Sequence, residues 1–155
     1  TLGRAKEDLD RAAEEISTKL AGIKGRADVA VLKAVVTQAS TAIPVVPLYF
    51  SILFQVMKER DCHEDCVAHI HRLFREQLYS NQPMRTDEIG RIRMDKYELD
   101  ADIQSEVRRR WSDITTDNVA DLADLGGFRD DFFRLFGFGI ENVDYDADIE
   151  LMIGY

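Results

Sequence analysis

Five potential metal ligands lie close together in the segment "CHEDCVAHIH", which spans 62–71. They are Cys62, His63, Cys66, His69 and His71. Thiolates and imidazoles are the usual ligands of zinc. On one continuous helix, Cys62, Cys66 and His69 would share a face, and a single face cannot easily surround an ion tetrahedrally. The spacing therefore favours small buried cysteines and surface histidines, and metal content would test the zinc alternative.

A second segment of interest is the uncharged stretch 34–57, "AVVTQASTAIPVVPLYFSILFQVM", in a chain that is 32% charged. Pro44 and Pro47 interrupt it. The apolar run that follows them is well short of the roughly 20 residues that a membrane-spanning helix needs. The pattern instead predicts a polar loop and then a buried helix with Pro47 in its first turn. No membrane partner is expected.

Three apolar residues of this stretch recur at every fourth position and would share one face of the predicted helix. They are Val46, Phe50 and Phe54. They could simply fill the core, which is the default for any apolar helix, or they could line one side of a tunnel for an acyl chain. Periodicity alone does not separate these interpretations.

A helix and a strand are predicted before the uncharged stretch, and they would set its position in the fold. Apolar residues at helical spacing predict an amphipathic helix over 3–21. The segment 28–36 is short, rich in valine and almost uncharged, which predicts a buried, parallel strand. Ligand sites in such αβ units lie beyond the carboxyl end of the strand. That end is formed by Val35, Val36 and Thr37.

Further elements are predicted downstream. The segment 64–79 has the pattern of an amphipathic helix. Within 87–99, a glycine turn and alternating apolar residues predict a small hairpin or extended excursion. A late strand is expected over 140–145. The coarse picture is mostly helical with few strands.

Between these segments the sequence predicts three more helices. The helix over 100–114 would bury one face made of Ile103, Val107, Trp111 and Ile114. A capping signal predicts a second helix that ends at Leu125. Gly126 and Gly127 would then break the chain before a short helix through Phe136.

Length and composition predict one globular domain, or part of one. With 155 residues, 45% of them hydrophobic, the chain can bury a core without disulfides or metal. The net charge of -9 makes nucleic acid a poor partner. Two cysteines four positions apart form no disulfide framework and fit a reducing cytoplasm, and no signal-peptide pattern opens the chain.

Five stretches taken together resemble a known family. They are "TLGRAKEDLD", "LKAVVTQASTAIPVVPLYFSILFQVMKE", "HEDC", "RLF" with a following "LY", and "DYDAD". They resemble the trans-2-enoyl-CoA reductases, the enoyl-acyl-carrier-protein reductases of the FabV type. The resemblance implies an α/β fold, in which 1–155 is the mostly helical C-terminal part of a Rossmann-like, short-chain-dehydrogenase-like domain. It also implies NADH-dependent reduction of an enoyl thioester of coenzyme A or acyl carrier protein in fatty acid synthesis.

The resemblance assigns roles to individual residues. Lys6 matches the lysine of the family's catalytic tyrosine–lysine pair, and its ammonium would also hold the ribose hydroxyls of NADH. Val35, Val36 and Thr37 match the segment whose backbone meets the nicotinamide half of the cofactor. The positions that border the acyl pocket in the family correspond to Val46, Phe50 and Phe54.

Two parts of the family's pattern are not found in the sequence. The catalytic tyrosine would lie four residues before Thr1, and there is no GxGxxG turn for the cofactor phosphates. We therefore expect the C-terminal portion of an enzyme that is inactive without its N-terminal half and monomeric when complete. The alternative is a stand-alone helical interaction or zinc-binding module related to such an enzyme.

Overall fold

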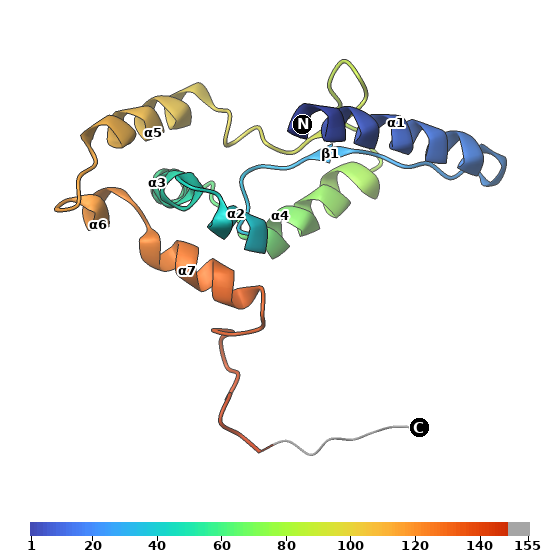
Figure 1. The fold of residues 1–155 in the computed structure, drawn as a ribbon. Helices are drawn as coiled ribbons and strands as arrows, with labels where there is room; N and C mark the ends of the chain where they lie inside the picture. Colours follow the sequence, from blue (N-terminus) through green and yellow to red (C-terminus); the bar gives the residue numbers. More distant parts are fainter. Residues whose placement is uncertain (149–155) are drawn as a thin grey trace.

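A computed structural model describes residues 1–148 as a mostly helical α/β arrangement with one small parallel sheet (Figure 1). The α-helices are α1 (Leu2–Leu20), α2 (Gln38–Ala42), α3 (Val46–Glu59), α4 (Cys66–Leu73), α5 (Ala101–Asp113), α6 (Val119–Leu122) and α7 (Leu125–Arg134). A 3₁₀ turn (Ala21–Ile23) follows α1, and a π-helical turn (Phe74–Leu78) follows α4. The strands are β1 (Ala30–Val31) and β2 (Ile92–Arg93).

The two strands pair in parallel, with Ala30 opposite Ile92. The predicted direction of the strand is confirmed, but the length expected from 28–36 is wrong. The ladder ends early because the N–H groups of Lys33 and Ala34 donate to side chains rather than to a neighbouring strand.

The connection before β2 forms the predicted excursion. An antiparallel bridge joins Thr86 to Ile92. Between them Gly90 turns the chain at φ +88°, a backbone conformation that glycine adopts without steric cost. The expectation of a small hairpin within 87–99 is confirmed in this form.

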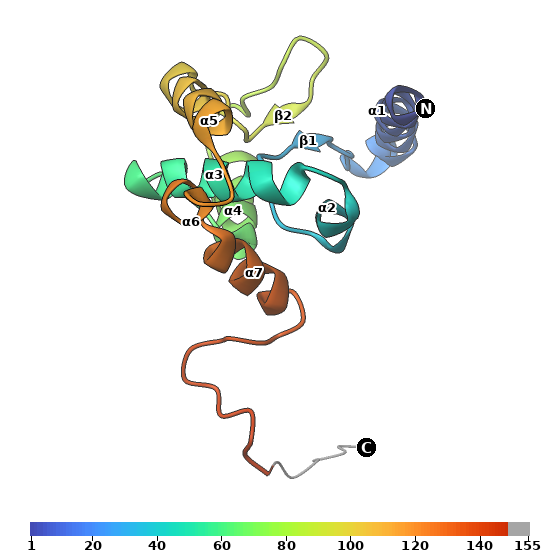
Figure 2. The same cartoon turned by 60° about the vertical axis from the view of Figure 1, so that its left-hand side comes forward.

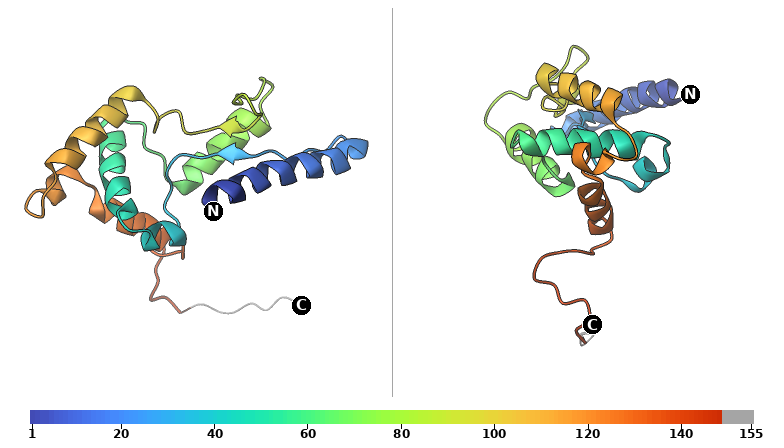
Figure 3. Two further views of the ribbon diagram at one scale, coloured as in Figure 1. Left: turned by 45° about the horizontal axis from the view of Figure 1, so that its top comes forward. Right: turned by 90° about the vertical axis from the view of Figure 1, so that its left-hand side faces the viewer.

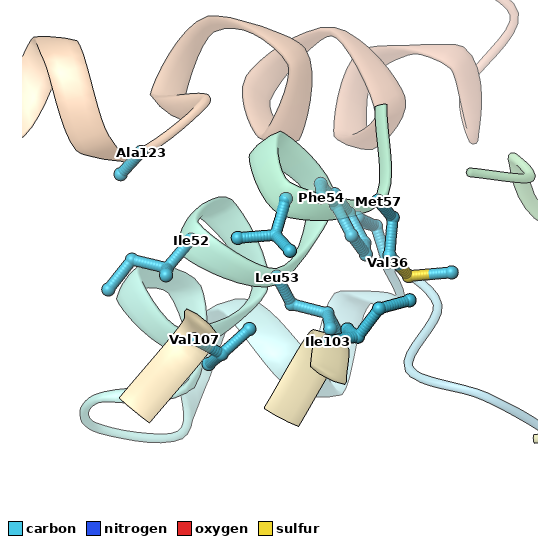
Figure 4. Packing of buried hydrophobic residues seen from close by; sticks show 9 residues of the cluster. Val36, Ile52, Leu53, Phe54, Met57, Ile103, Val107 and Ala123 are labelled. Atoms are coloured by element: carbon cyan, nitrogen blue, oxygen red, sulfur yellow. The ribbon is translucent and has the colours of Figure 1, made fainter. Parts of the chain in front are cut away.

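α3 lies at the centre of the larger core and contacts α5 and α7 (Figure 2). Pro47 lies in its first turn, as the sequence predicts. Six of its residues are buried, namely Ser51, Ile52, Leu53, Phe54, Val56 and Met57. Figure 4 shows its apolar side chains packed with those of Val36, Ile103, Val107 and Ala123. The uncharged stretch therefore contains the predicted buried helix.

α1 lies beside β1 and away from α5 and α7 (Figure 3). It is the predicted amphipathic helix, yet none of its residues is buried. Leu2, Leu9 and Ile16 are 77%, 49% and 46% exposed. Ser17 Oγ ties its last turns to Ala27, accepting from the Ala27 N–H at 2.9 Å and donating to the Ala27 carbonyl at 3.0 Å. Within the described residues its apolar face is therefore covered only in part.

The break predicted at Gly126 and Gly127 is wrong, because both lie inside α7. Asp124 caps this helix by accepting a hydrogen bond from the Gly127 N–H at 2.8 Å. The first N–H groups of a helix have no partner within the helix, so a capping carboxylate stabilises this turn.

Two expectations in the C-terminal half are wrong in part or in full. On α5, Ile103 and Val107 are buried as predicted, but Trp111 is 39% exposed. Arg110 is buried in its place, because its guanidinium makes two hydrogen bonds to the Glu59 carboxylate on α3. Residues 140–145 form turns rather than a strand, and the Tyr145 hydroxyl accepts from a backbone N–H and donates to a backbone carbonyl there.

Candidate functional site

The predicted cofactor segment lies between β1 and α2. Val36 is 3% exposed and belongs to the core, Val35 is half-buried, and Thr37 is exposed. Thr37 Oγ1 accepts from the Ser40 N–H at 3.2 Å, and Ser40 Oγ accepts from the Thr37 N–H at 2.9 Å, which completes a capping box for α2. Burial of the Val36 side chain and the capping hydrogen bonds of Thr37 therefore fix the backbone of this segment.

Two side chains from distant parts of the chain hold the backbone just before this segment. The Lys33 N–H donates to His69 Nε2 at 3.3 Å, and the Ala34 N–H donates to Glu98 Oε2 at 2.5 Å. Glu98 Oε1 in turn accepts from the Tyr49 hydroxyl at 3.1 Å. An unpaired backbone N–H in a buried setting is costly, so these acceptors stabilise a non-strand backbone here.

The ring of His69 is fully buried, and its contacts define its tautomer. Because Nε2 accepts from the Lys33 N–H, the proton lies on Nδ1, which is 2.8 Å from Glu64 Oε2 and donates to it. Arg72 pairs with both oxygens of Glu64 and also donates to the Met94 carbonyl at 3.1 Å. Burial lowers the pKa of His69, which favours this neutral form.

Lys33 adds a buried ammonium to this network. Its side chain is 3% exposed, donates to the Ala34 carbonyl at 3.0 Å and lies 5.2 Å from the centroid of the Phe54 ring. Burial lowers the pKa of Lys33, and the charges of Glu64 and Glu98 oppose that change only in part.

The proposed acyl-pocket residues differ in their exposure. Val46 and Phe50 are half-buried, and Phe54 is 1% exposed within the core. The Phe50 ring lies 5.7 Å from Phe54 and 6.3 Å from Phe128 on α7. Val46 and Phe50 are therefore partly accessible to solvent, whereas Phe54 packs against Phe50 inside the core.

Lys6 lies exposed on α1 and faces β1. It borders a groove of about 320 Å³, whose other lining residues are Leu9, Asp10, Val29, Ala30, Val31, Leu32 and Arg91. The structure thus places Lys6 beside the strand, and it places Val35 to Thr37 beyond the strand's carboxyl end.

The cysteines and histidines do not form the helical face that the sequence suggests. α3 ends at Glu59 and α4 begins at Cys66, so Cys62 lies in the intervening turn and shares no helix face with His69. Asp65 begins α4 by accepting from the Ala68 N–H at 2.7 Å. Across residues 1–148, no group of three or more His, Cys, Asp and Glu side chains is placed to hold a metal ion.

A small cavity of about 200 Å³ lies next to the predicted cofactor segment. Its lining comprises Val36, Asp65, Cys66, Val67, Asp131, Arg134 and Leu135. Burial raises the pKa of Asp131, so its carboxyl group favours the neutral form more than an exposed aspartate does. Sequence reasoning missed Asp131 and Glu98 and expected His69 at the surface, whereas His69 is fully buried, because their contacts come from distant parts of the chain.

Two family models match the chain. "Trans-2-enoyl-CoA reductase catalytic region" matches residues 1–79, which is just over half of the chain, and "Enoyl reductase FAD binding domain" matches 86–149. The chain therefore belongs to the trans-2-enoyl-CoA reductase family, as the sequence resemblance predicts.

Named relatives agree with this assignment. The chain is 50% identical over 152 residues to an enoyl-[acyl-carrier-protein] reductase [NADH] of Coxiella burnetii, and 54% identical over 149 residues to the FabV enzyme of Aeromonas salmonicida. These matches cover 97% and 96% of the chain but only 37% of each relative. The chain thus spans little more than a third of the length of the curated relatives it matches.

Solved structures of trans-2-enoyl-CoA reductases are also similar to this chain. The trans-2-enoyl-CoA reductase of Clostridium acetobutulicum in complex with NADH matches with a TM-score of 0.84 and 48% identity, over 96% of this chain and 37% of that one. The Treponema denticola enzyme in complex with NAD matches with a TM-score of 0.84 and 41% identity, again over 96% and 37%.

The description of the second family model names FAD, but the matched residues do not fit a flavin dinucleotide. The range 86–149 contains seventeen acidic and eight basic residues, a poor setting for a diphosphate. Six of its seven arginines form ion pairs with carboxylates, and it holds no GxGxxG turn.

Proposed function

We propose that residues 1–155 are the C-terminal portion of a single Rossmann-like reductase domain that uses NADH to reduce the trans-2 double bond of enoyl thioesters. The observation that carries the proposal is the match to named enoyl reductases over 96–97% of the chain at about half identity. The thioester is carried by coenzyme A or acyl carrier protein, the two carriers that appear in the relatives' names. The complete enzyme acts in the cytoplasm as a monomer in fatty acid synthesis.

The roles of the residues follow from the charge that develops during the reaction. NADH supplies a hydride to Cβ of the enoyl group, and negative charge builds on the thioester oxygen. Lys6 holds the ribose hydroxyls and stabilises the tyrosine of the N-terminal half as that tyrosine gives its proton to this oxygen. The backbone of Val35 to Thr37 contacts the nicotinamide half. Val46, Phe50 and Phe54 form an apolar side that keeps water from the acyl chain.

The uncovered surfaces of the chain fit this division of the enzyme. No residue of α1 is buried, and β1 has a single partner strand among the described residues. In the proposal, the N-terminal half covers α1 and contributes the tyrosine and the glycine-rich turn. No helix in residues 1–148 is long and apolar enough to span a membrane.

The test is NADH oxidation followed by absorbance. The full-length parent protein and residues 1–155 alone would each be supplied with a trans-2-enoyl-CoA and with an enoyl-acyl carrier protein. We expect turnover from the parent and none from residues 1–155. If the parent fails to oxidise NADH with either thioester, the reductase proposal is contradicted. If residues 1–155 alone turn over a thioester, the active site is not divided between this chain and an N-terminal half.

A further inference from the structure

We infer that Glu98 is a positioning residue for the cofactor segment, acting through the backbone N–H of Ala34. This inference rests on the proposed function, in which Val35 to Thr37 contact the nicotinamide half of NADH. It assigns a role to a residue from the turn before α5, far from the segment in sequence.

The first observation is the direct contact. Glu98 Oε2 lies 2.5 Å from the Ala34 nitrogen, which is one residue before the cofactor segment. A carboxylate that accepts from a backbone N–H makes a charge-assisted hydrogen bond, which is stronger than a neutral one. Because Val36 is anchored in the core, fixing Ala34 leaves Val35 little freedom to move.

The second observation is that the Glu98 side chain is itself held in place. Its Oε1 accepts from the Tyr49 hydroxyl on α3 at 3.1 Å. Gln104 on α5 donates to the Glu98 carbonyl at 2.7 Å and to the Tyr49 oxygen at 3.3 Å. Glu98 therefore joins α3, α5 and the cofactor segment, and a group supported in this way can hold a binding element within a fraction of an ångström.

The test compares two conservative variants in the full-length parent protein. Glu98→Gln keeps the length and an acceptor oxygen, whereas Glu98→Asp keeps the charge but withdraws the acceptor from Ala34. If Glu98 acts by position, Glu98→Asp raises KM for NADH about tenfold, the size expected for one lost hydrogen bond, with a much smaller change in kcat. Glu98→Gln retains most of the affinity. The matched control, Glu88→Asp, makes the same change at an exposed position of the preceding loop.

Other outcomes would overturn the inference. If wild-type parent turns over but Glu98→Asp leaves KM for NADH unchanged, Glu98 does not position the segment. If Glu98→Gln raises KM for NADH and Glu98→Asp does not, the charge of Glu98 rather than its position matters. If Glu98→Asp does not fold, Tyr49→Phe decides, because losing the hydroxyl that holds Oε1 should raise the same KM by a smaller factor, and an unchanged KM rejects the role. A wild-type parent that oxidises no NADH rejects the proposed function as well.

Discussion

The rings of Phe50 and Phe128 lie edge to face with their centroids 6.3 Å apart, which connects α3 to α7. Phe50 is half-buried, whereas Phe54, one turn along the same helix, is 1% exposed. Two aromatic residues on one face of α3 therefore have different surroundings. A change at Phe50 reaches the proposed acyl pocket, and a change at Phe54 acts first on the core.

Replacing Phe50 tests the pocket. In the full-length parent, Phe50→Asp should abolish reduction of long-chain enoyl thioesters, because it places a charge where the acyl chain would lie. Turnover of a short-chain substrate should fall less, and the ratio of the two kcat/KM values is the measurement. Ile52→Val, at a fully buried position of the same helix, is the control, with an expected loss of about 0.5–1.5 kcal/mol of unfolding free energy and little change in that ratio. Equal losses for both chain lengths in Phe50→Asp would mean that Phe50 serves only the core.

Replacing Lys6 tests the proposed catalytic pair. Lys6→Met in the full-length parent removes the ammonium and keeps an unbranched apolar stem. We expect kcat to fall about 10²-fold or more and KM for NADH to rise, because Lys6 would serve both the tyrosine and the ribose. Lys19→Met makes the same change at an exposed site in the last turn of α1 and should leave both constants near wild type. Wild-type kinetics in Lys6→Met would remove Lys6 from the site.

Because His63 is partly buried, we expect the free energy of unfolding to fall in acid. Burial lowers its pKa to about 4, and its Nδ1 has no hydrogen-bond partner within residues 1–148. Since the folded pKa lies below the unfolded value of about 6.5, the unfolded state binds the proton first as the pH falls. The contribution of His63 is therefore complete above about pH 6.5 and is lost progressively between pH 6.5 and 4.

Urea unfolding of the parent at several pH values measures this effect. Wild type should lose more unfolding free energy than His63→Gln between pH 7 and pH 4.5, because glutamine does not titrate. The remaining slope in the variant includes His69, whose pKa is also lowered by burial. Parallel pH curves for the two proteins would show that His63 is not held neutral by the fold.

The elements that could be predicted are those with a local cause. The spacing of apolar residues is sufficient to predict α1 and α3 as helices. Pro47 lies in the first turn of α3, as the sequence predicts. The same reasoning predicts the helix–strand unit, but it places the carboxyl end of the strand at Val35 to Thr37, whereas β1 ends at Val31. Family resemblance added the chemistry, which periodicity does not contain.

The elements that could not be predicted depend on partners far along the chain. β1 ends early because His69 and Glu98 take the N–H groups that a longer strand would use. Arg110 replaces Trp111 on the buried face of α5 because Glu59 on another helix neutralises it. Apolar patterning assigns buried positions to large apolar side chains, so it misses a buried arginine whose partner is distant.

The two adjacent glycines of α7 give a matched pair of stability tests. A Cβ on Gly126 would meet nothing within 4 Å, so Gly126→Ala should raise the unfolding free energy by roughly 0.5–1 kcal/mol through helix propensity. A Cβ on Gly127 would lie 2.6 Å from Lys58 Nζ and collide with the Asp124 carboxylate, which pairs with Lys58 and caps α7.

Gly127→Ala should therefore destabilise the protein by about 1–3 kcal/mol, since it separates the ion pair or displaces the cap. Chemical unfolding of both variants in the full-length parent measures the difference, and the sign should be opposite at the two positions. If Gly127→Ala stabilises as much as Gly126→Ala, the close approach of Asp124 and Lys58 to the Gly127 backbone does not exist in solution.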